Sequence, residues 1–426
     1  MGKIKSPHVL VFPIPAKGHL IPLLDLSYVL ASHGLSITIL SITNEVSHLQ
    51  PLLDTAASNA LQIQPLILSI PAIQNIEELP LSQIPVFLQS LQTLADPLEQ
   101  WFLQQQEQIS DGFGFGPPVC MISDIFLGWT QETATKLGIP RVVFHPSGAF
   151  GVSVIYSLWA HMPHQGVESD DDPIPIPDLP VPTTFRKSQI SPFLRMYKSS
   201  DPVSGFMRHS MNLNSKSWGT LINTFNDLEP IYIDHLQKLS ARPAWSVGPL
   251  FLQREQKTDI VVREKPSSSI ESVCLQWLNS QKEKSVLYIC FGSMCILSNK
   301  QIQELAAGLE GSQQSFIWVL RDPSSGLPAN EYGVLPDGFE ERIQGRGLVI
   351  RGWAPQLLIL SHSSIGGYLT HCGWNSTLES IASGVPLVTW PMFADQHFNC
   401  FLIVDYLKIG VRLCEGATTV PNREDL

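Results

Sequence analysis

The chain has 426 residues, of which 27 are lysine or arginine and 38 are aspartate or glutamate, so its formal net charge is −11. This length predicts two or three domains with sizeable cores. Only 15 % of the residues are charged and 44 % are hydrophobic, which indicates a folded globular chain. The acidic balance argues against nucleic acid and an anionic membrane as partners. An anionic ligand must therefore be held by local dipoles and hydrogen bonds.

Seven cysteines are scattered along the chain, and their spacing suggests neither a disulfide framework nor a metal site. Most lie in apolar runs, where a reduced cysteine packs as a small hydrophobe. We therefore expect a reducing compartment, the cytoplasm, and no bound metal. The N-terminal apolar run is too short for a signal peptide, and glycine and proline interrupt the uncharged stretch Val142 to Ala160. We expect that stretch to be a strand and a helix rather than a membrane span.

Short β-rich runs alternate with amphipathic helical patterns in the first half of the chain, which predicts a parallel α/β sheet. The predicted strands are 8–12, 36–41, 119–124, 141–144 and 218–225. The predicted helices are 20–33, 129–137 and 190–214, with a further helix opening at 227–230. Gly34 and Gly138 fit the C-terminal ends of the first two helices. Pro13 to Lys17 is predicted to be a loop.

Two segments of this half have unusual compositions. Asp170 to Pro182 contains five prolines and four acidic residues. Proline excludes a helix and a central strand, so we expect a solvated surface loop there. Gly112 to Gly116 is rich in glycine but precedes its strand, whereas a nucleotide-binding glycine loop follows one. We interpret that segment as a loop.

The pattern changes near Val247 to Leu250, and the residues that follow are polar and aperiodic. We expect an N-terminal domain at 1–250, a linker at 251–270 and a C-terminal domain at 271–426. A second α/β series follows, with predicted strands at 286–291, 316–320 and 348–350 and a helix at 300–309. Ser298 and Gln301 form a capping-box pattern before that helix. Two such domains predict a ligand cleft at the carboxyl ends of their strands.

The densest chemical signal is the segment 353–396. It predicts a strand, a tight turn and a helix in succession, at 365–370, 371–376 and 377–383. This arrangement aims free N–H groups and a helix dipole at one point and so favours an anion. His371, Asn375 and Ser376 add side-chain donors there. The site can therefore hold a diphosphate without a metal.

Other side chains of the segment suit the rest of a nucleotide sugar. Glu379, one turn into the helix, can accept from two ribose hydroxyls, and Trp353 can stack on a planar base. Asp395 and Gln396 are a polar pair suited to sugar hydroxyls. Each residue alone also has a structural interpretation, since a glycine turn is often only a turn and tryptophans often belong to the core. Their joint spacing is what favours a binding site.

The segment resembles the plant secondary product glycosyltransferase signature of the family 1 UDP-glycosyltransferases and matches its length without a gap. The resemblance covers nearly the whole chain, through Gly18-His19, Ile122-Ser-Asp124, Asn223-Thr-Phe225, Phe291-Gly-Ser293 and Phe316-Ile-Trp-Val-Leu-Arg321. It implies the GT-B fold, an α/β architecture of two Rossmann-like, doubly wound domains that face each other across a cleft. The N-terminal domain would bind the acceptor and the C-terminal domain the UDP-sugar.

By motif position, the resemblance implies a complete set of donor-binding residues. They are Trp353 and the Ala354 backbone at uracil, Gln356 and Glu379 at the ribose, Ser293, His371, Asn375 and Ser376 at the diphosphate, and Trp374, Asp395 and Gln396 at the sugar. In this family a glutamine at the last position tends to accompany glucose. UDP-glucose is therefore the expected donor, with no cofactor and no metal.

His19 lies in the first loop after the first strand, at the position of the family's general base. The resemblance implies that it takes the proton of an acceptor hydroxyl as that oxygen attacks the anomeric carbon. Asp124 ends a strand of the same domain and can bond the other imidazole nitrogen, or it can be a helix N-cap. The implied reaction is a single displacement with inversion, which gives a β-glycoside.

We therefore expect an O-glycosyltransferase that moves glucose to a small hydroxylated plant metabolite, a phenolic or flavonoid, and that acts as a monomer. The alternatives are a UDP-sugar-binding protein without transferase activity and a GT-B epimerase or hydrolase. Lys17 departs from the family, which usually has glutamine there, and it can contact an acidic acceptor, depress the pKa of His19 or point to solvent. Since the family continues into closing helices beyond Leu426, we expect an incomplete C-terminus.

Overall fold

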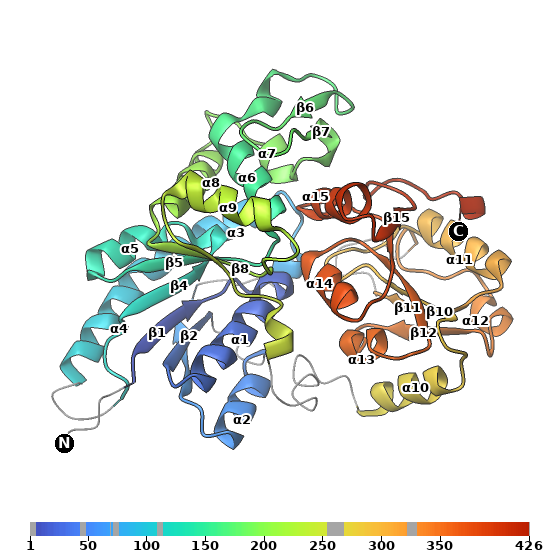
Figure 1. Cartoon of the computed structure of the whole chain (residues 1–426), viewed down its shortest axis with the longest axis horizontal. Coiled ribbons are helices and arrows are strands. Elements are labelled where there is room, and N and C mark those ends of the chain that lie inside the picture. The colour runs from blue at the N-terminus through green and yellow to red at the C-terminus, as the bar shows by residue number, and fades with distance from the viewer. Residues whose placement is uncertain are drawn as a thin grey trace. The chain divides into compact units, whose positions relative to one another are not determined.

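The computed structural model describes residues 6–42, 48–68, 70, 76–108, 114–253, 268–321 and 330–425. The chain divides into two compact units, Met1–Phe185 with Pro192–Arg263 and Arg186–Ser191 with Glu264–Leu426. Figure 1 shows that each unit is built around one sheet with helices packed against it. The predicted linker 251–270 lies mostly outside the described residues, and its bounds stay a prediction.

The first unit contains a seven-stranded sheet in the order β3-β2-β1-β4-β5-β8-β9. All of its neighbouring strands are parallel. The strands are β1 (His8–Phe12), β2 (Ser36–Ile42), β3 (Ile63–Leu68), β4 (Cys120–Asp124), β5 (Arg141–His145), β8 (Gly219–Ile222) and β9 (Ala244–Ser246). The chain runs outward from β1 in one direction and then from β4 in the other. The carboxyl ends of β1 and β4 therefore form the switch point at which such sheets bind ligands.

Helices cover both faces of this sheet (Figure 1). The helices of this unit are α1 (Lys17–Ser32), α2 (Gln50–Ser58), α3 (Ile84–Ser90), α4 (Ala95–Gln108), α5 (Thr130–Leu137), α6 (Ala149–His161), α7 (Pro192–Arg195), α8 (Pro202–Leu213) and α9 (Pro230–Ser240), of which α7 lies beside β6 and β7. The single predicted helix at 190–214 is wrong, because it is two helices. Pro202 opens the second one, and Asp201 caps it by accepting from the Ser204 N–H at 2.8 Å.

The first helix begins earlier than predicted. The Ala16 carbonyl already accepts from the His19 and Leu20 N–H groups, at 2.8 and 2.7 Å. His19 therefore lies in the first turn of α1, and the prediction that it lies in a loop is wrong. A helix places the imidazole more rigidly than a loop would, because its backbone is held by the first intrahelical bonds. Gly34 follows the helix with a positive φ of 87°, as its predicted position at the C-terminal end requires.

The proline-rich segment 170–182 is more ordered than the predicted solvated loop. Pro173–Pro175 forms β6, which pairs with β7 (Thr184–Arg186) in a small two-stranded sheet. Ile174 and Ile176 are buried, although the residues beside them are not. Alternating proline and isoleucine place the isoleucines on one face, and a two-stranded sheet tolerates proline because every strand is an edge. The alternation of proline and isoleucine has the two-residue period of a strand, and the loop prediction did not take it into account.

The second unit contains a six-stranded parallel sheet in the order β12-β11-β10-β13-β14-β15. The strands are β10 (Val286–Cys290), β11 (Ser315–Leu320), β12 (Gly347–Arg351), β13 (Ile365–Thr370), β14 (Leu387–Thr389) and β15 (Gly410–Arg412). The helices are α10 (Ser268–Asn279), α11 (Asn299–Ser312), α12 (Phe339–Arg342), α13 (Gln356–Leu360), α14 (Trp374–Ala382) and α15 (Gln396–Phe401). Separate apolar clusters fill its two faces, so this unit too is doubly wound, as predicted.

Helix ends in the second unit test two local predictions. The capping box is confirmed, since the Gln301 side chain accepts from the Ser298 N–H at 2.9 Å and the Ser298 hydroxyl caps the helix. The predicted turn at 371–376 is too long, because α14 starts at Trp374. The Gly373 carbonyl already accepts from the Thr377 N–H at 2.9 Å. Within the described ranges, no helix is both long enough and apolar enough to cross a membrane.

Candidate active site

His19 and Asp124 meet at the switch point of the first sheet. His19 Nδ1 lies 2.7 Å from Asp124 Oδ2, and the Asp124 side chain is fully buried while that of His19 is 22 % exposed. A carboxylate only accepts, so Nδ1 carries the hydrogen of this bond. The proton on Nδ1 leaves Nε2 as the basic nitrogen of a neutral imidazole.

The second oxygen of Asp124 caps a turn. Oδ1 accepts from the Phe126 N–H at 2.9 Å, at the start of the short helical turn Ile125–Leu127. Both alternatives left open by the sequence, imidazole partner and N-cap, therefore hold at once. The Phe126 ring packs against the imidazole, with centroids 5.3 Å apart. These contacts hold the His19–Asp124 pair in one orientation.

Lys17 departs from the family pattern two residues before His19. Its ammonium lies 3.9 Å from Glu77 Oε2, and its backbone N–H donates to Glu77 Oε1 at 3.1 Å. The Lys17 side chain is 24 % exposed. The Lys17 ammonium is therefore paired with the Glu77 carboxylate of the first unit, and the side chain does not point only to solvent.

The predicted diphosphate residue His371 is enclosed by glycines. A Cβ atom at Gly292 or Gly373 would lie 2.6 or 2.5 Å from His371 Nε2, so only glycine fits at both places. Burial lowers the pKa of His371 to about 4. The imidazole is therefore neutral at physiological pH and offers an N–H donor without a full charge. Ser293 follows Gly292 in the loop after β10, and Asn375 lies in the first turn of α14.

The predicted ribose residues form one hydrogen-bonded cluster. Gln356 Nε2 donates to Ser376 Oγ at 3.0 Å and to Glu379 Oε2 at 2.6 Å. The hydroxyls of Tyr288 and Tyr368 donate to Gln356 Oε1 at 3.2 and 3.0 Å. The structure thus brings together three predicted residues that lie on α13 and α14. The sequence analysis did not predict these two tyrosines, which are paired residues of the neighbouring strands β10 and β13.

The predicted uracil residues lie in the connection between β12 and α13. Trp353 is half-buried and Ala354 is buried, and the Ala354 carbonyl accepts from the Gln356 N–H at 2.8 Å. This connection, the loop after β10 and the turn after β13 all follow parallel strands of one sheet. They therefore lie at the same carboxyl edge.

The predicted sugar residues are tied to the diphosphate turn. Gln396 Oε1 accepts from the Met392 and Phe393 N–H groups at 2.9 and 3.1 Å, so its oxygen supports the preceding loop. Asn399 Nδ2 donates to Asp395 Oδ2 at 3.2 Å and to the Cys372 carbonyl at 2.9 Å. Sequence reasoning missed Asn399, although it lies four residues after Asp395 on a helix. Trp374, the first residue of α14, is buried.

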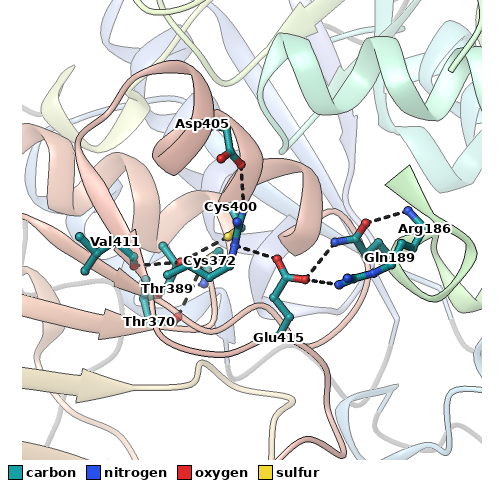
Figure 2. A network of polar contacts seen from close by, with 10 residues as sticks. Arg186, Gln189, Thr370, Cys372, Thr389, Cys400, Asp405, Val411 and Glu415 are labelled. Carbon is teal, nitrogen blue, oxygen red and sulfur yellow. Dashed lines mark hydrogen bonds and ion pairs between the residues drawn. The ribbon is translucent and has the colours of Figure 1, made fainter. Parts of the chain in front are cut away.

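Figure 2 shows the polar support beneath the same turn. The Cys372 thiol contacts the Thr370 carbonyl, and the Cys400 thiol contacts the Thr389 hydroxyl. The two threonines are paired residues of the neighbouring strands β13 and β14. Arg412 pairs with Asp405 and Glu415, at 2.7 and 2.8 Å. Glu415 also accepts from Arg186 and Gln189, which belong to the segment Arg186–Ser191 of the second unit.

The described residues contain no group of three or more His, Cys, Asp or Glu side chains that could hold a metal ion. The first unit offers a basic imidazole held by a buried carboxylate. The second offers a helix N-terminus, neutral donors and a buried carboxylate one turn into the helix. Two doubly wound domains with these features define a nucleotide-dependent group transferase.

Comparison with known proteins identifies the family within this class of transferases. Residues 207–412 match the family model of UDP-glucoronosyl and UDP-glucosyl transferase. The chain is 41 % identical to UDP-glycosyltransferase 89B2 of Stevia rebaudiana, over 98 % of this chain and 87 % of that protein. It is 40 % identical to flavonol 3-O-glucosyltransferase UGT89B1 of Arabidopsis thaliana, over 100 % of this chain and 87 % of that protein.

Solved structures agree with this result. UGT73P12 of Glycyrrhiza uralensis, complexed with glycyrrhetinic acid 3-O-monoglucuronide, superposes with a TM-score of 0.82 at 32 % identity, over 99 % of this chain and 85 % of that one. UGT89C1 of Arabidopsis thaliana, complexed with UDP-L-rhamnose, gives 0.76 at 32 % identity, over 99 % and 88 %. This chain belongs to the plant family 1 UDP-glycosyltransferases and has their GT-B fold. It is a UDP-dependent glycosyltransferase, and the predicted family and fold are confirmed.

Proposed function

We propose that this enzyme transfers glucose from UDP-glucose to a hydroxyl of a small phenolic or flavonoid and inverts the anomeric centre. The contact of 2.7 Å between His19 Nδ1 and Asp124 Oδ2, in a chain of this family, carries the proposal. Relatives support the acceptor class by their names, which specify a flavonol and, for the Nicotiana tabacum enzyme, scopoletin. UGT89C1 of Arabidopsis thaliana has also been solved in complex with quercetin.

In the proposed reaction, His19 is the general base. Its Nδ1–H donates to Asp124, so Nε2 accepts the proton of the acceptor hydroxyl. The acceptor oxygen forms a bond to the anomeric carbon as the bond from that carbon to the diphosphate oxygen breaks. Attack opposite the leaving group converts the α-linkage of the donor into a β-glycoside. Asp124 stabilises the resulting imidazolium without taking its proton.

The second unit would hold UDP and stabilise it as it leaves. The N-terminus of α14 would direct backbone N–H groups and the positive end of its dipole at the diphosphate. His371, Asn375, Ser376 and Ser293 would add neutral donors, which suits a chain with a net charge of −11. Glu379 would accept from the ribose hydroxyls, and Trp353 would stack on uracil.

An assay with UDP-glucose and a panel of phenols tests the proposal against its alternatives. UDP release that requires an acceptor, with a β-glucoside as the product, supports transfer. UDP-glucose binding without turnover on any acceptor would instead indicate a UDP-sugar-binding protein. Release of UDP without an acceptor would indicate a hydrolase.

The Gly292→Ala variant tests the role of His371 in donor binding. The new methyl group would lie 2.6 Å from the imidazole, and the backbone has a positive φ of 74° that alanine disfavours. Displacement of the imidazole is expected to weaken UDP binding by about tenfold or more, as measured by calorimetry.

Gly384→Ala is the matched control for Gly292→Ala. Gly384 also has a positive φ, of 65°, but a Cβ atom there meets nothing within 4 Å. This control should lower the melting temperature and leave UDP affinity unchanged. Equal UDP affinities in the two variants would remove His371 from the donor site.

Gln396→His tests the choice of donor sugar. The glutamine oxygen accepts two backbone N–H groups, whereas a neutral imidazole has one acceptor nitrogen. The ratio of kcat/KM for UDP-glucose to that for UDP-galactose should fall by about tenfold. Gln396→Glu keeps the accepting oxygen but lacks the amide donors, so it separates loop support from sugar contact. An unchanged ratio in Gln396→His would place Gln396 outside the sugar site.

We also infer that the enzyme works in the cytoplasm. All seven cysteines are free thiols, and five of them are buried. Unpaired buried thiols are typical of proteins kept in a reducing compartment. Fractionation of cells that express the tagged chain tests this localisation.

A further inference from the structure

A buried cation lies directly behind the His19–Asp124 pair. Arg141 opens β5 and has no exposed surface, and its side chain runs along the sheet to the end of β4. Each of the five guanidinium N–H donors has its own acceptor. Nε donates to Ser123 Oγ at 2.7 Å, Nη1 to Asn214 Oδ1 at 3.0 Å and Ser217 Oγ at 2.7 Å, and Nη2 to the Asp124 and Leu127 carbonyls, both at 3.3 Å.

These five acceptors are all neutral. A buried guanidinium is usually paired with a carboxylate, because burying an unbalanced charge is costly. Burial lowers the pKa of Arg141 to about 10, and the charge of Asp124 opposes this shift. Arg141 is therefore a cation at physiological pH, and the opposite charge of Asp124 acts on it through space. The same carboxylate accepts the hydrogen bond of His19.

We propose that Arg141 is a positioning residue for proton transfer. Its bond to the Asp124 carbonyl holds that residue against His19, and its buried charge opposes protonation of the imidazole at Nε2. This inference rests on the proposed function, in which His19 is the general base. The guanidinium would act through its field and through its bond to the Asp124 carbonyl, without touching the substrate. The backbone bond to the Asp124 carbonyl also fixes the end of β4, from which the carboxylate projects.

The charge of Arg141 also bears on a second imidazole, that of His145, the last residue of the same strand. Burial, and after it the charge of Arg141, lowers the pKa of His145 to about 3. The charge of His19 acts on His145 in the same direction, so the two imidazoles lie within electrostatic reach of each other. A cation that opposes protonation of one imidazole opposes that of the other.

Other titratable groups near the pair contribute less to its charge. Lys17 of α1 is paired with Glu77. On β5, His145 is neutral and accepts or donates at Nε2 with the Tyr156 hydroxyl of α6, 2.8 Å away. Burial raises the pKa of Tyr156, which keeps that hydroxyl neutral. Arg141 and Asp124 are thus the charged groups that these contacts leave beside the His19 imidazole.

The sign of the pH effect follows from this arrangement. Protonation of His19 places a second cation near Arg141, so removing the guanidinium charge makes protonation easier. The acidic limb of the kcat/KM profile for the acceptor, which reports the enzyme before the acceptor binds, should then move to higher pH. A shift of about one pH unit is expected for the loss of one nearby charge. At a pH below the acidic limbs of both the wild type and the variant, this shift corresponds to about a tenfold loss of kcat/KM.

Two variants of Arg141 separate its charge from its shape. Arg141→Met should move the acidic limb upward by about one pH unit, whereas Arg141→Lys, which keeps the charge, should leave the limb near its wild-type position. Both variants lose hydrogen bonds and should melt at lower temperature. The measurement is kcat/KM for the acceptor between about pH 5 and 9, at saturating UDP-glucose.

A second pair of variants leaves Arg141 in place and so guards against a misfolded Arg141→Met. The Ser217 hydroxyl accepts from Arg141 Nη1 at 2.7 Å, so Ser217→Asp places a carboxylate beside the guanidinium. Its negative charge offsets the positive charge of Arg141. It should move the limb upward as well. Ser217→Asn has a similar shape without the charge and should not move it. A wild-type limb in a folded Arg141→Met or Ser217→Asp, or an equal shift in Ser217→Asn, overturns the inference.

The outcome for His19 distinguishes this inference from the proposed function. If His19→Ala keeps near-normal turnover, the general-base assignment and the role of Arg141 both fail. If His19→Ala is inactive while the limb stays fixed in Arg141→Met and Ser217→Asp, only the inference about Arg141 fails.

Discussion

Replacing His19 with alanine is expected to lower kcat for glucoside formation by about 10²- to 10⁴-fold, the usual contribution of a positioned general base. The variant lacks the basic Nε2 that would take the acceptor's proton. The predicted donor residues belong to the second unit, so UDP-glucose affinity should stay close to that of the wild type. Initial rates with the best phenol of the panel, together with calorimetric titration of UDP, measure both effects.

His33→Ala is the control for this result. His33 is exposed at the other end of the same helix, where its Nδ1 bonds to the Val29 carbonyl at 2.8 Å. Its removal deletes an imidazole from α1 without touching Asp124, so kcat should be unchanged. Near-normal turnover of His19→Ala would show that His19 is not the base.

Asp124→Asn is expected to lower kcat by about 10²- to 10⁴-fold. The variant should fold but melt at a lower temperature, because the buried guanidinium of Arg141 loses the opposite charge of Asp124. The amide oxygen can still accept from the Phe126 N–H and so preserves the cap. The amide nitrogen then faces His19 Nδ1 and donates to it, which moves the imidazole proton to Nε2. That tautomer cannot accept a proton from the acceptor hydroxyl. Turnover and thermal unfolding of the variant measure the two parts of this prediction.

Asp201→Asn and a double variant complete the test. Asp201 caps α8 through the Ser204 N–H at 2.8 Å, so its amide should keep the cap and normal kcat. Because His19 and Asp124 would act as a unit, His19→Ala combined with Asp124→Asn should be no slower than His19→Ala alone. Independent, multiplicative losses, or normal turnover of Asp124→Asn, would contradict a shared role.

Much of the site could be predicted because its residues are close in sequence. The donor residues of segment 353–396 lie on one strand-turn-helix series, where spacing alone determines which side chains share an edge. Gln356, Ser376 and Glu379 do lie in one cluster. Their roles toward UDP stay predictions. The exact helix starts were missed, since the first turn of a helix is stabilised by backbone bonds that side-chain patterns reveal poorly.

Features that depend on residues far apart in sequence could not be predicted in the same way. Arg141 was assigned to a strand, but its acceptors Asn214 and Ser217 lie 73 and 76 residues away. Nothing local indicates that a buried arginine will find five neutral acceptors. The lone charge at the start of an apolar strand was the signal that could have singled it out.

The amino-acid sequence by itself determined the fold class, most strands of the two sheets and the identity of the chemical groups, because periodicity and turn residues act over short distances. The short or outer strands β3, β9, β14 and β15 were not delimited. Tertiary structure alone decided which groups meet. His19 and Asp124 are 105 residues apart and come within 2.7 Å only because β4 returns to pair with β1. The net charge of −11 described the whole chain, but the folded core decided that a buried guanidinium bonds to the end of β4, from which the carboxylate that meets His19 projects. Such an arrangement depends on distance and burial, which the order of residues does not contain.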